Sequence, residues 1–541
     1  MSHRACYLAV CISGLLLFFQ SCTPSDDEPT QGFKVEGIVT SENGTPLQGV
    51  LVNSIVDTVV TDESGFYSIF SYPVGALEFS KSGYVKWIEA VRSRPEINVS
   101  LTKESPTGVT LFTIKTVIQS CQTGGLDSNY QVVEIRDFGQ GIGNFTLTAD
   151  KLWVLKNRVF VNEGQTLTIE PGTIIKAGTG QVETACALVV ARGGKLIAKG
   201  TAAQPIIFTS EDDPVMNDKF GAECLPTSLK AKDKGRWGGV ILLGKATINA
   251  PGGETYVDGI PTTEPRAIFG GTDDDDNSGT LEYVSIRHGG ISLAIGNQIN
   301  GLTLGGVGRG TTLHHVEVYA NAYDGFRFIG GTVNTKYLTS SFCGDDAFDY
   351  TGGWRGNNQY WFAMQDVDAD RGVEGTSSED KTALPASRPV IFNATFSGPG
   401  SDTGKRALSF FDNGGGEWHN SIFMAYAFGA DIEFKGQTET DSYQRMVTKE
   451  LELQRNILFD VSFQPWFALN NQSALSNSST AVLQASNFVE EYFNRSENAN
   501  RFEDPQLIDL VPKPGGPAAK QGSIPEDPFI EFTEYKGSFA P

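Results

Sequence analysis

Apolar and polar residues alternate with period two along the first part of the chain. The segments KVEGIVT, VLVNSIVDTVV and FYSIF each have the pattern of a short strand, and Asn-Gly and Ser-Gly pairs separate them. Alternation interrupted by such turns is typical of antiparallel strands joined as hairpins. The pattern predicts a small antiparallel β-sandwich over residues 33–105.

From about Leu152 the pattern changes to short apolar strands that recur at a regular interval. The stretches YDGFRFIGGT (323–332) and GDDAFDYTGGW (344–354) repeat one pattern 22 residues apart. A repeat of this length without the leucine spacing of leucine-rich repeats indicates a parallel β-helix. We therefore expect an all-β chain in which the β-helix spans residues 106–440.

Two resemblances refine this interpretation. The NGTPLQGV turn and the TDESGFYSI strand resemble the carboxypeptidase regulatory-like domain, which implies a non-catalytic module for attachment or spacing. PGTIIKAG, WGGVILLGKA and GTLEYVSIRHGG resemble a family of right-handed parallel β-helix surface lipoproteins, whose activity is mostly unassigned. The second resemblance implies the handedness of the coil and a surface location, but no catalytic residues.

The last hundred residues differ from the coil. DSYQRMVTKELELQRNILF (441–459) is rich in good helix formers, which predicts a helix or a mixed cap. An open end of a β-helix exposes a free strand edge, so a cap is expected there. The fold class is therefore a sandwich followed by a right-handed parallel β-helix with a partly helical C-terminal cap. Residues 441–541 are expected to hold the last coils, the helical insert and a Pro/Gly-rich tail.

The chain begins with MSHRACYLAVCISGLLLFFQSC, a basic start followed by an apolar run shorter than the ~20 residues that cross a bilayer. This predicts a signal peptide over residues 1–21. The small residue before Cys22 resembles a bacterial lipobox, which implies lipidation of Cys22, including palmitate. The acidic tether at 22–32 resembles an export signal, which implies an outer-membrane anchor facing the cell exterior.

The formal net charge of −22 argues against nucleic acid or an anionic membrane surface as a ligand. The same charge is compatible with cations and with neutral glycans. After Cys22 the chain holds only Cys121, Cys186, Cys224 and Cys343. In an exported protein these can form disulfides. Cys186 and Cys224 are the preferred pair, because they flank one loop excursion of the coil.

Aspartates are the main candidates for a functional site. Two full charges ~5 Å apart repel by about 3 kcal/mol at an effective dielectric near 20, so a close stack needs a cation, a proton or an arginine. Calcium prefers oxygen ligands of this kind. The alternative is an exposed charge ladder of Arg327, Asp349 and Glu374 on successive coils, which contributes little. The candidate calcium ligands lie one coil apart and are Asp345, Asp346 and Asp349 with Asp366, Asp368 and Asp370.

An enzyme on this fold would use the same region. A polysaccharide lyase needs a base that removes the proton next to a uronate carboxylate, beside a positive group that stabilises the enolate. Asp346 and Asp370 would supply the acidic side of such a site. A glycosidase would need two carboxylates, which adjacent coils supply readily. No lyase motif surrounds the candidate bases, which are Arg355, Arg371, Lys405 and Arg406.

Other polar and aromatic groups carry weaker signals. His288, His314, His315 and His419 have no ligand spacing, and two adjacent histidines in a strand should face opposite sides. Trp354, Tyr360, Trp361 and Trp418 could form a sugar-stacking platform, although stacking inside the coil is the commoner use. FGGTDDDDNSG (269–279) precedes a strand and has good turn residues, so we expect a hydrated turn.

These observations favour a non-enzymatic surface lipoprotein. It would bind a glycan or an outer-membrane partner, such as a β-barrel transporter, through the β-helix. The alternative is a calcium-dependent polysaccharide lyase or glycosidase on the same face. A concave groove with Arg or Lys beside clustered carboxylates would favour the enzyme, whereas a flat face with only paired charges would count against it.

Overall fold

The computed structural model describes most of the chain from Gly32 to Pro541. The gaps are residues 42–43, 74, 85–86, 92–93, 102, 104–110, 120–127, 180–184, 215–228, 295–296, 437–439, 463–466, 471–478, 521 and 523–524. The predicted signal peptide, Cys22 and nearly all of the acidic tether therefore lie outside the described residues. Within the described residues, none of the helices combines the length and apolar character that spanning a membrane requires.

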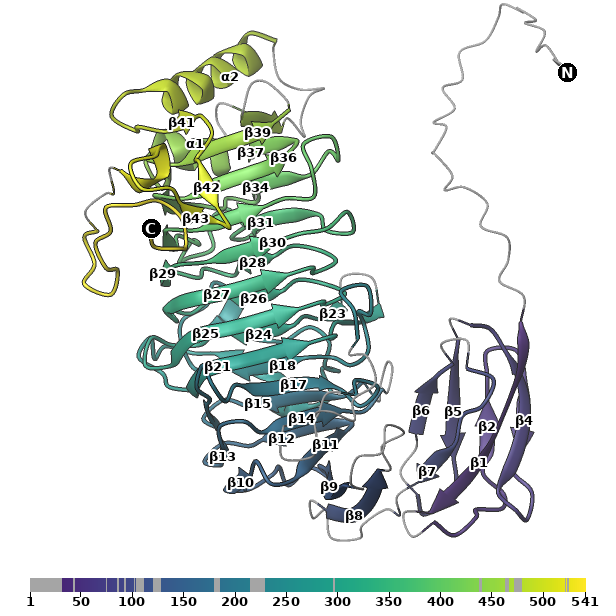
Figure 1. The fold of residues 1–541 in the computed structure, drawn as a ribbon. Coiled ribbons are helices and arrows are strands. Elements are labelled where there is room, and N and C mark those ends of the chain that lie inside the picture. The colour runs from purple at the N-terminus through teal and green to yellow at the C-terminus, as the bar shows by residue number, and fades with distance from the viewer. Residues whose placement is uncertain are drawn as a thin grey trace, which may run out of the picture.

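The N-terminal module consists of two small sheets packed face to face, as Figure 1 shows. Alternate residues of β1, β4, β5 and β7 point inward, and Val35, Val39 and Phe79 are fully buried between the sheets. The strands of the first sheet are β4 (Phe66–Ser71), β1 (Phe33–Ser41) and β7 (Val99–Leu101). Those of the second are β3 (Thr58–Val60), β2 (Leu51–Asn53), β5 (Ala76–Ser80) and β6 (Trp87–Ala90).

The rest of the chain winds into a parallel β-helix, which confirms the predicted fold class. Figure 1 shows the coils stacked in chain order, with α2 (Ser479–Asn494) at the far end. One face is a continuous parallel sheet. Its strands are β12 (Arg158–Val161), β15 (Ala187–Val190), β18 (Val240–Leu243), β24 (Leu302–Gly305), β26 (Phe326–Ile329), β28 (Phe348–Thr351), β31 (Arg371–Gly375), β34 (Arg406–Phe410), β37 (Phe428–Glu433) and β40 (Phe467–Asn470).

The other two faces form one long bent sheet. Strands β21 (Gly279–Arg287), β25 (Thr312–Tyr319) and β27 (Thr335–Ser341) run through the bend. Before the bend lie β10 (Phe145–Leu147), β13 (Thr166–Ile169), β16 (Lys195–Lys199), β29 (Asn357–Gln359), β32 (Val390–Phe392), β35 (Gly416–His419) and β38 (Leu451–Gln454). After it lie β9 (Ser128–Arg136), β11 (Leu152–Lys156), β14 (Ile174–Ala177), β17 (Ile206–Ser210), β30 (Phe362–Met364), β33 (Thr395–Ser397), β36 (Ile422–Tyr426), β39 (Ile457–Val461) and β41 (Arg501–Phe502).

From β21 onward, the bend of this sheet is built from one residue per coil in the left-handed backbone region. Non-glycine residues adopt this conformation at a cost of about 1–2 kcal/mol each, and asparagine is among those that tolerate it best. At this position of each of these coils the chain turns although the residue is not a glycine. The residues are Tyr283, His315, Tyr337, Tyr360, Asn393, Asn420 and Arg455, with φ between +49° and +63°.

The side chains at this bend stack on one another. Tyr283 and His315 have ring centroids 4.4 Å apart, His315 and Tyr337 4.3 Å, and Tyr337 and Tyr360 4.6 Å. His314 Nδ1 lies 2.9 Å from His315 Nδ1. The prediction that the two histidines face opposite sides is wrong, because the left-handed turn at His315 breaks the strand alternation.

Aromatic rings also fill the interior of the coil. Phe348 stacks on Phe326 at 5.2 Å and on Trp361 at 4.2 Å, with the ring planes within 9° and 8° of parallel. Trp354, Trp361 and Trp418 are completely buried. The interpretation of these tryptophans as core stacks is confirmed, and they offer no surface for a sugar.

Different elements close the two ends. At the start, β8 (Leu111–Gln119) pairs antiparallel with β9. At the other end, the segment predicted as a helix or a mixed cap is mixed, because it forms α1 (Ser442–Val447) before β38 and β39 continue the coil. Pairing with β35 and β36 overrides the helix propensity of that segment. The longer helix of the cap is α2, which the sequence analysis does not predict.

Short strand pairs project from the coil or lie in its tail. They are β19 (Glu254–Tyr256) with β20 (Ile268–Gly270), β22 (Ile291–Ala294) with β23 (Asn297–Ile299), and β42 (Leu507–Ile508) with β43 (Val511–Pro512). Beyond them the C-terminal tail, residues 525–541, runs back across the outer face of the bent sheet. Gln359 Nε2 donates to the carbonyl of Glu531 at 2.7 Å, and Asn393 Nδ2 donates to that of Tyr535 at 2.9 Å.

Candidate functional site

Most of the predicted acidic residues gather around β26, β28 and β31. Arg327, Asp349 and Glu374 are paired in register on these successive strands, as the repeat predicts. The column is not exposed, however, because Asp349 is only 4% exposed and Asp258 from the projecting β19–β20 segment lies over Arg327. The expectation of an exposed ladder is therefore corrected to a covered ionic network.

Two arginines organise this network. Arg327 Nη1 lies 2.9 Å from Asp349 Oδ2 and 3.4 Å from Asp324 Oδ2. Arg371 Nη1 lies 2.6 Å from Asp370 and 2.8 Å from Glu374. Each guanidinium thus holds at least two carboxylates, so neither is available as a base.

More carboxyl groups than cations meet in this network. Asp324, Asp345 and Asp346 each offer a carboxylate oxygen within 4.8 Å of the other two, which is close enough to hold a metal ion. Burial, followed by the charge of Asp349, raises the pKa of Asp324 well above its usual value. Burial, followed by the charge of Glu374, does the same to the pKa of Asp346. A proton or a hard cation such as calcium would relieve this repulsion.

The other predicted residues lie in separate clusters. Asp366 and Asp368 contact Lys234 at 3.3 and 3.4 Å rather than joining the trio around Asp346. Arg355 Nη2 lies 3.3 Å from Asp274, one of the four aspartates of the predicted hydrated turn. That turn is only partly hydrated. Asp273 and Asp275 are exposed, whereas Asp276 is buried.

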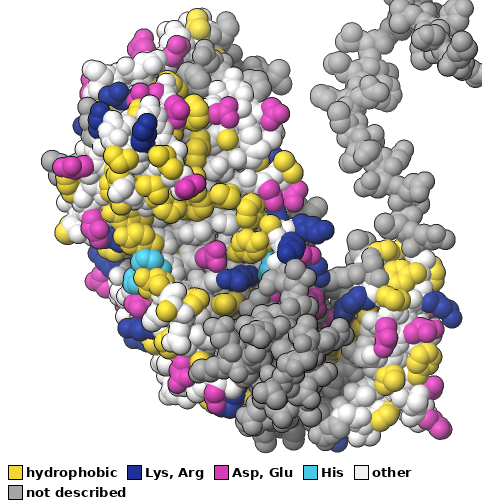
Figure 2. All heavy atoms as spheres, in the orientation of Figure 1, with side chains coloured by type: hydrophobic (Ala, Val, Ile, Leu, Met, Phe, Trp, Pro, Cys, Tyr) yellow, Lys and Arg dark blue, Asp and Glu magenta, His cyan; other side chains and the backbone are white. Residues whose placement is uncertain are grey.

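The remaining candidate bases are also paired. Lys405 Nζ lies 3.9 Å from Asp370, and Arg406 Nε donates to Asp431 at 2.7 Å. Asp370 therefore lies between Arg371 and Lys405. Figure 2 shows the same mixture on the face in view, where acidic side chains are scattered with Lys and Arg side chains among them.

Replacing Asp346 by asparagine is expected to stabilise the protein at high pH and not at low pH. The pKa of Asp346 in the folded state lies above the unfolded value of about 3.9, so the wild type loses stability as pH rises above that value. Asparagine carries no charge and escapes this loss. Thermal unfolding with a chelator at about pH 4 and about pH 8 measures the difference.

Adding calcium to the wild type and to Asp346→Asn tests whether these carboxylates hold an ion. Calcium should raise the melting temperature of the wild type more than that of Asp346→Asn, because an ion stabilises only the state that binds it. Equal shifts in the two proteins would show that the Asp324, Asp345 and Asp346 carboxylates do not hold the ion.

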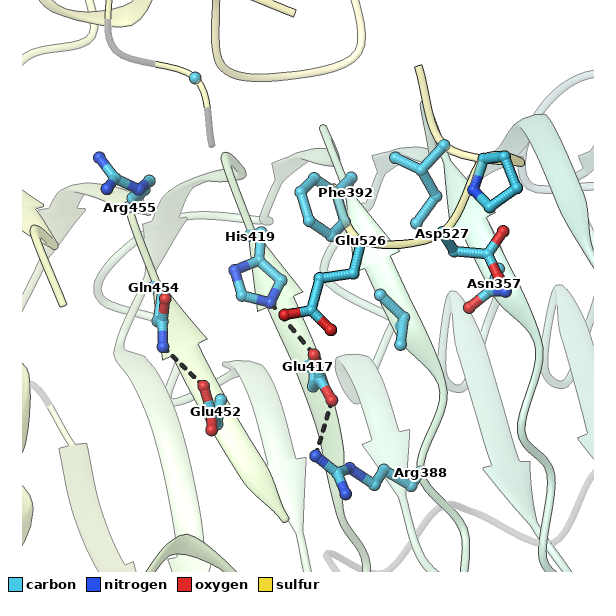
Figure 3. A pocket seen from close by; sticks show the side chains of 14 residues that line it. Asn357, Arg388, Phe392, Glu417, His419, Glu452, Gln454, Arg455, Glu526 and Asp527 are labelled. Carbon is cyan, nitrogen blue, oxygen red and sulfur yellow. Dashed lines mark hydrogen bonds and ion pairs between the residues drawn. The ribbon is translucent and has the colours of Figure 1, made fainter. Parts of the chain in front are cut away.

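A second candidate site is a cavity of about 840 Å³ between the bent sheet and the C-terminal tail. Its floor is the outer face of β29, β32, β35 and β38, and its cover includes Glu526 and Asp527 of the tail (Figure 3). In a β-strand alternate side chains point to the same face, so Glu417 and His419 both project from β35 into the cavity.

Glu417 is the centre of this cavity, as Figure 3 shows. Its Oε1 accepts a hydrogen bond from Arg388 Nη2 at 2.8 Å, and its Oε2 lies 3.5 Å from His419 Nε2. The ring of His419 stacks on Phe392 with centroids 4.5 Å apart. His419 Nδ1 is buried and has no hydrogen-bond partner in the described part of the chain.

The neighbouring coil places a second carboxylate beside the first. Glu452 on β38 is paired in register with Glu417, and its Oε2 accepts from Gln454 Nε2 at 2.6 Å. The contact with His419, and then Arg388, lowers the pKa of Glu417 although burial opposes this. Burial, and then the charge of Glu417, raises the pKa of Glu452. The two carboxyl groups therefore differ in their tendency to hold a proton.

No motif in the sequence indicates this cavity. His419 has no ligand spacing, and neither Glu417 nor Glu452 belongs to a recognisable site pattern. The available signal is the alternation in GEWH and LELQ, which places polar side chains on the outer face of two adjacent strands. The cover is contributed by a tail far away in the sequence, which no periodicity indicates.

The predicted disulfide between Cys186 and Cys224 stays a prediction, because only Cys186 lies in the described part of the chain. Cys186 has no disulfide to a described cysteine, is fully buried inside the coil, and its Sγ donates to the carbonyl of Leu155 at 3.2 Å. Burial raises its pKa to about 12. The predicted partner Cys224 lies outside the described residues. Cys343 is also a free, buried thiol.

Comparison with known proteins agrees with the fold. Residues 139–503 match the family described as "Pectate-lyase like beta helix domain". No curated protein and no solved structure matches the chain. The match covers more than half of the chain and contains both the ionic network and the floor of the cavity, whereas the tail that covers the cavity lies beyond it. The chain therefore belongs to the pectate-lyase-like β-helix domain family.

Proposed function

We propose that this protein is a surface-attached, non-enzymatic glycan-binding protein and that the glycan binds in the cavity around Glu417. The observation that carries the proposal is the lining of that cavity. It combines an aromatic ring, a paired carboxylate and arginine, and a buried histidine nitrogen without a partner in the described part of the chain. A small number of fixed polar groups beside apolar ones is typical of small-molecule sites.

The binding role is supported by the charges of the ionic network. A lyase base must give up its proton before it can accept another. Carboxylates around Arg371 raise its pKa although burial opposes this, so the guanidinium holds its proton more firmly than usual. Arg355, Lys405 and Arg406 each have a carboxylate partner within 4.0 Å. These pairings count against the calcium-dependent lyase.

One observation favours glycoside hydrolysis as a second candidate. Glu417 and Glu452 lie on adjacent parallel strands, which are about 4.8 Å apart, and their pKa values are shifted in opposite directions. Such a pair can act as a proton donor and a nucleophile or base. The same cavity would then cleave the glycan that it binds.

Replacing Glu417 by glutamine is expected to weaken glycan binding by about tenfold or more, because the exchange breaks a charge-assisted hydrogen-bond network. Calorimetry with the purified protein and a panel of neutral and uronate-containing oligosaccharides measures the affinity. Glu254→Gln is the matched control, because Glu254 also pairs with an arginine, Arg192, but far from the cavity.

The same incubations test the enzymatic alternatives. New reducing ends that disappear in Glu452→Gln would show glycoside hydrolysis, and new absorbance from an unsaturated product would show a lyase. Binding without either product supports the proposal. If Glu417→Gln binds the glycan as tightly as the wild type, the glycan does not bind in the cavity around Glu417.

Attachment to the outer membrane is the second part of the proposal. It rests on the lipobox-like sequence before Cys22 and on the acidic tether. The regulatory-like module would hold the coil away from the membrane, and an outer-membrane transporter is proposed as a partner only by analogy with similar modules. Labelling cells with a palmitate analogue tests the anchor, and Cys22→Ala is expected to abolish the label.

A further inference from the structure

A small pocket near the end of the chain is lined mainly by basic groups. Its volume is about 220 Å³, and its lining includes Arg501 of β41, Lys520 and Lys536 with only one acidic side chain, Glu503. Arg501 Nη1 lies 3.4 Å from Glu503, so the acid offsets part of the charge of one arginine. The pocket therefore has a net positive charge in a chain whose formal net charge is −22.

Lys536 is the buried wall of this pocket and is only 2% exposed. Burial, and then the charges of Arg455 and Arg501, lowers its pKa to about 8, and Glu503 opposes the effect. The charged groups that act on the pKa of Lys536 include Arg455, Arg501 and Glu503, and Lys520 lines the same pocket. Like charges near a buried ammonium group disfavour its charged form, and an anion bound in the pocket would favour it.

We propose that the pocket of Arg501, Lys520 and Lys536 binds a tetrahedral oxyanion, either free sulfate or phosphate or the same group carried as an ester on a glycan. Arginine and lysine are the side chains that bind such anions by charge-assisted hydrogen bonds. Bulk water occupies about 30 Å³ per molecule, so the pocket has room for the anion and several waters.

The position of the pocket connects it to the larger cavity. Arg455 lines that cavity, and Figure 3 shows its side chain beyond Gln454 at one edge. The same arginine contributes to the field around Lys536. An acidic substituent on a glycan in the cavity would therefore be attracted toward this edge. The anion site itself does not depend on the proposed glycan function.

The test uses inorganic sulfate with the purified protein. Sulfate is expected to bind the wild type at pH 7 and to bind Lys520→Met about tenfold more weakly, because one charge-assisted contact is removed. Lys520 is exposed, so its replacement should leave the fold intact. Lys199→Met is the control, because Lys199 is an exposed lysine on β16, outside both cavities. Sodium chloride at equal ionic strength removes the general effect of salt.

The dependence on pH separates binding from a structural role. The sulfate affinity of the wild type should fall as pH rises above about 8, because Lys536 then loses its proton. Lys536→Met should bind weakly and show no such dependence. Sulfate that fails to bind, or that binds Lys520→Met as tightly as the wild type, would overturn the proposal.

The source of the anion is decided by a second comparison. An oligosaccharide with and without a sulfate ester is titrated into the wild type and into Lys520→Met. Preference for the sulfated form that is lost in the variant supports an ester on a glycan, whereas binding of sulfate alone supports a free anion. Glu417→Gln should leave the sulfate affinity unchanged, so failure of the glycan proposal and failure of the anion site are distinguishable.

Discussion

Replacing Trp361 by alanine is expected to lower the free energy of unfolding by about 3–5 kcal/mol, the range for deleting a large buried aromatic side chain. Trp361 is completely buried, and its ring stacks on Phe348 at 4.2 Å and on Phe328 at 5.7 Å. The exchange also leaves Thr335 Oγ1 without the hydrogen bond that Trp361 Nε1 donates at 2.9 Å. Urea unfolding followed by circular dichroism measures the loss.

Tyr256→Ala provides the control for this measurement. Tyr256 is an aromatic residue in the projecting strand β19 and is 38% exposed, so its removal should change stability by about 0.5 kcal/mol or less. Each coil contacts mainly its neighbours, so the coils before and after a weakened coil can unfold in separate transitions. A single transition of unchanged midpoint in Trp361→Ala would contradict the stacked core.

Replacing Arg327 by methionine is expected to cost a similar amount, about 3–5 kcal/mol, because it leaves buried carboxylates without their counter-charge. Asp324 and Asp349 are 3% and 4% exposed, and both lie within 3.4 Å of Arg327 Nη1. Chemical unfolding at neutral pH measures the loss. The loss should shrink in acid, where protonation neutralises the same carboxyl groups.

A second substitution tests the cause of this effect. Asp349→Asn placed on Arg327→Met should restore part of the stability, because one unpaired charge disappears. Arg309→Met is the matched control. The Arg309 side chain is 51% exposed and lies 3.8 Å from Asp274, so its loss should cost at most about 1 kcal/mol. Equal losses in Arg327→Met and Arg309→Met would show that burial of the network contributes nothing.

Much of the fold is predictable from the sequence because the β-helix repeats itself. Phe326 and Phe348, which are 22 residues apart in the repeat, are register partners in the parallel sheet. The apolar residue of one coil therefore stacks on that of the next. The end of the coil is less predictable. Leu451 and Leu453 lie among good helix formers, yet pairing with β35 makes the segment a strand. That pairing is a long-range contact, which local propensity does not contain.

The candidate site shows the same division. The column of Arg327, Asp349 and Glu374 follows from the repeat and is observed. Its burial does not follow, because Asp258 reaches it from an excursion outside the periodic pattern. The cavity around Glu417 is predictable only in part. The floor of the cavity follows from the repeat, which sets the strands β29, β32, β35 and β38 side by side. The cover is formed by the tail, and no local sequence pattern shows that the tail contacts these strands.

The return of the tail across finished coils has a consequence for the order of assembly. Glu531 bonds to Gln359 across a separation of 172 residues, and closing so long a loop carries an entropic cost that local coil growth does not. During synthesis the tail leaves the ribosome after the coils that it covers. The coil can therefore stack before its cover arrives, and the cavity around Glu417 forms only after the tail has been made. A chain cut short before Glu526 would keep the floor of the cavity and lose its cover, so premature termination would leave a folded coil with an open groove in place of the cavity.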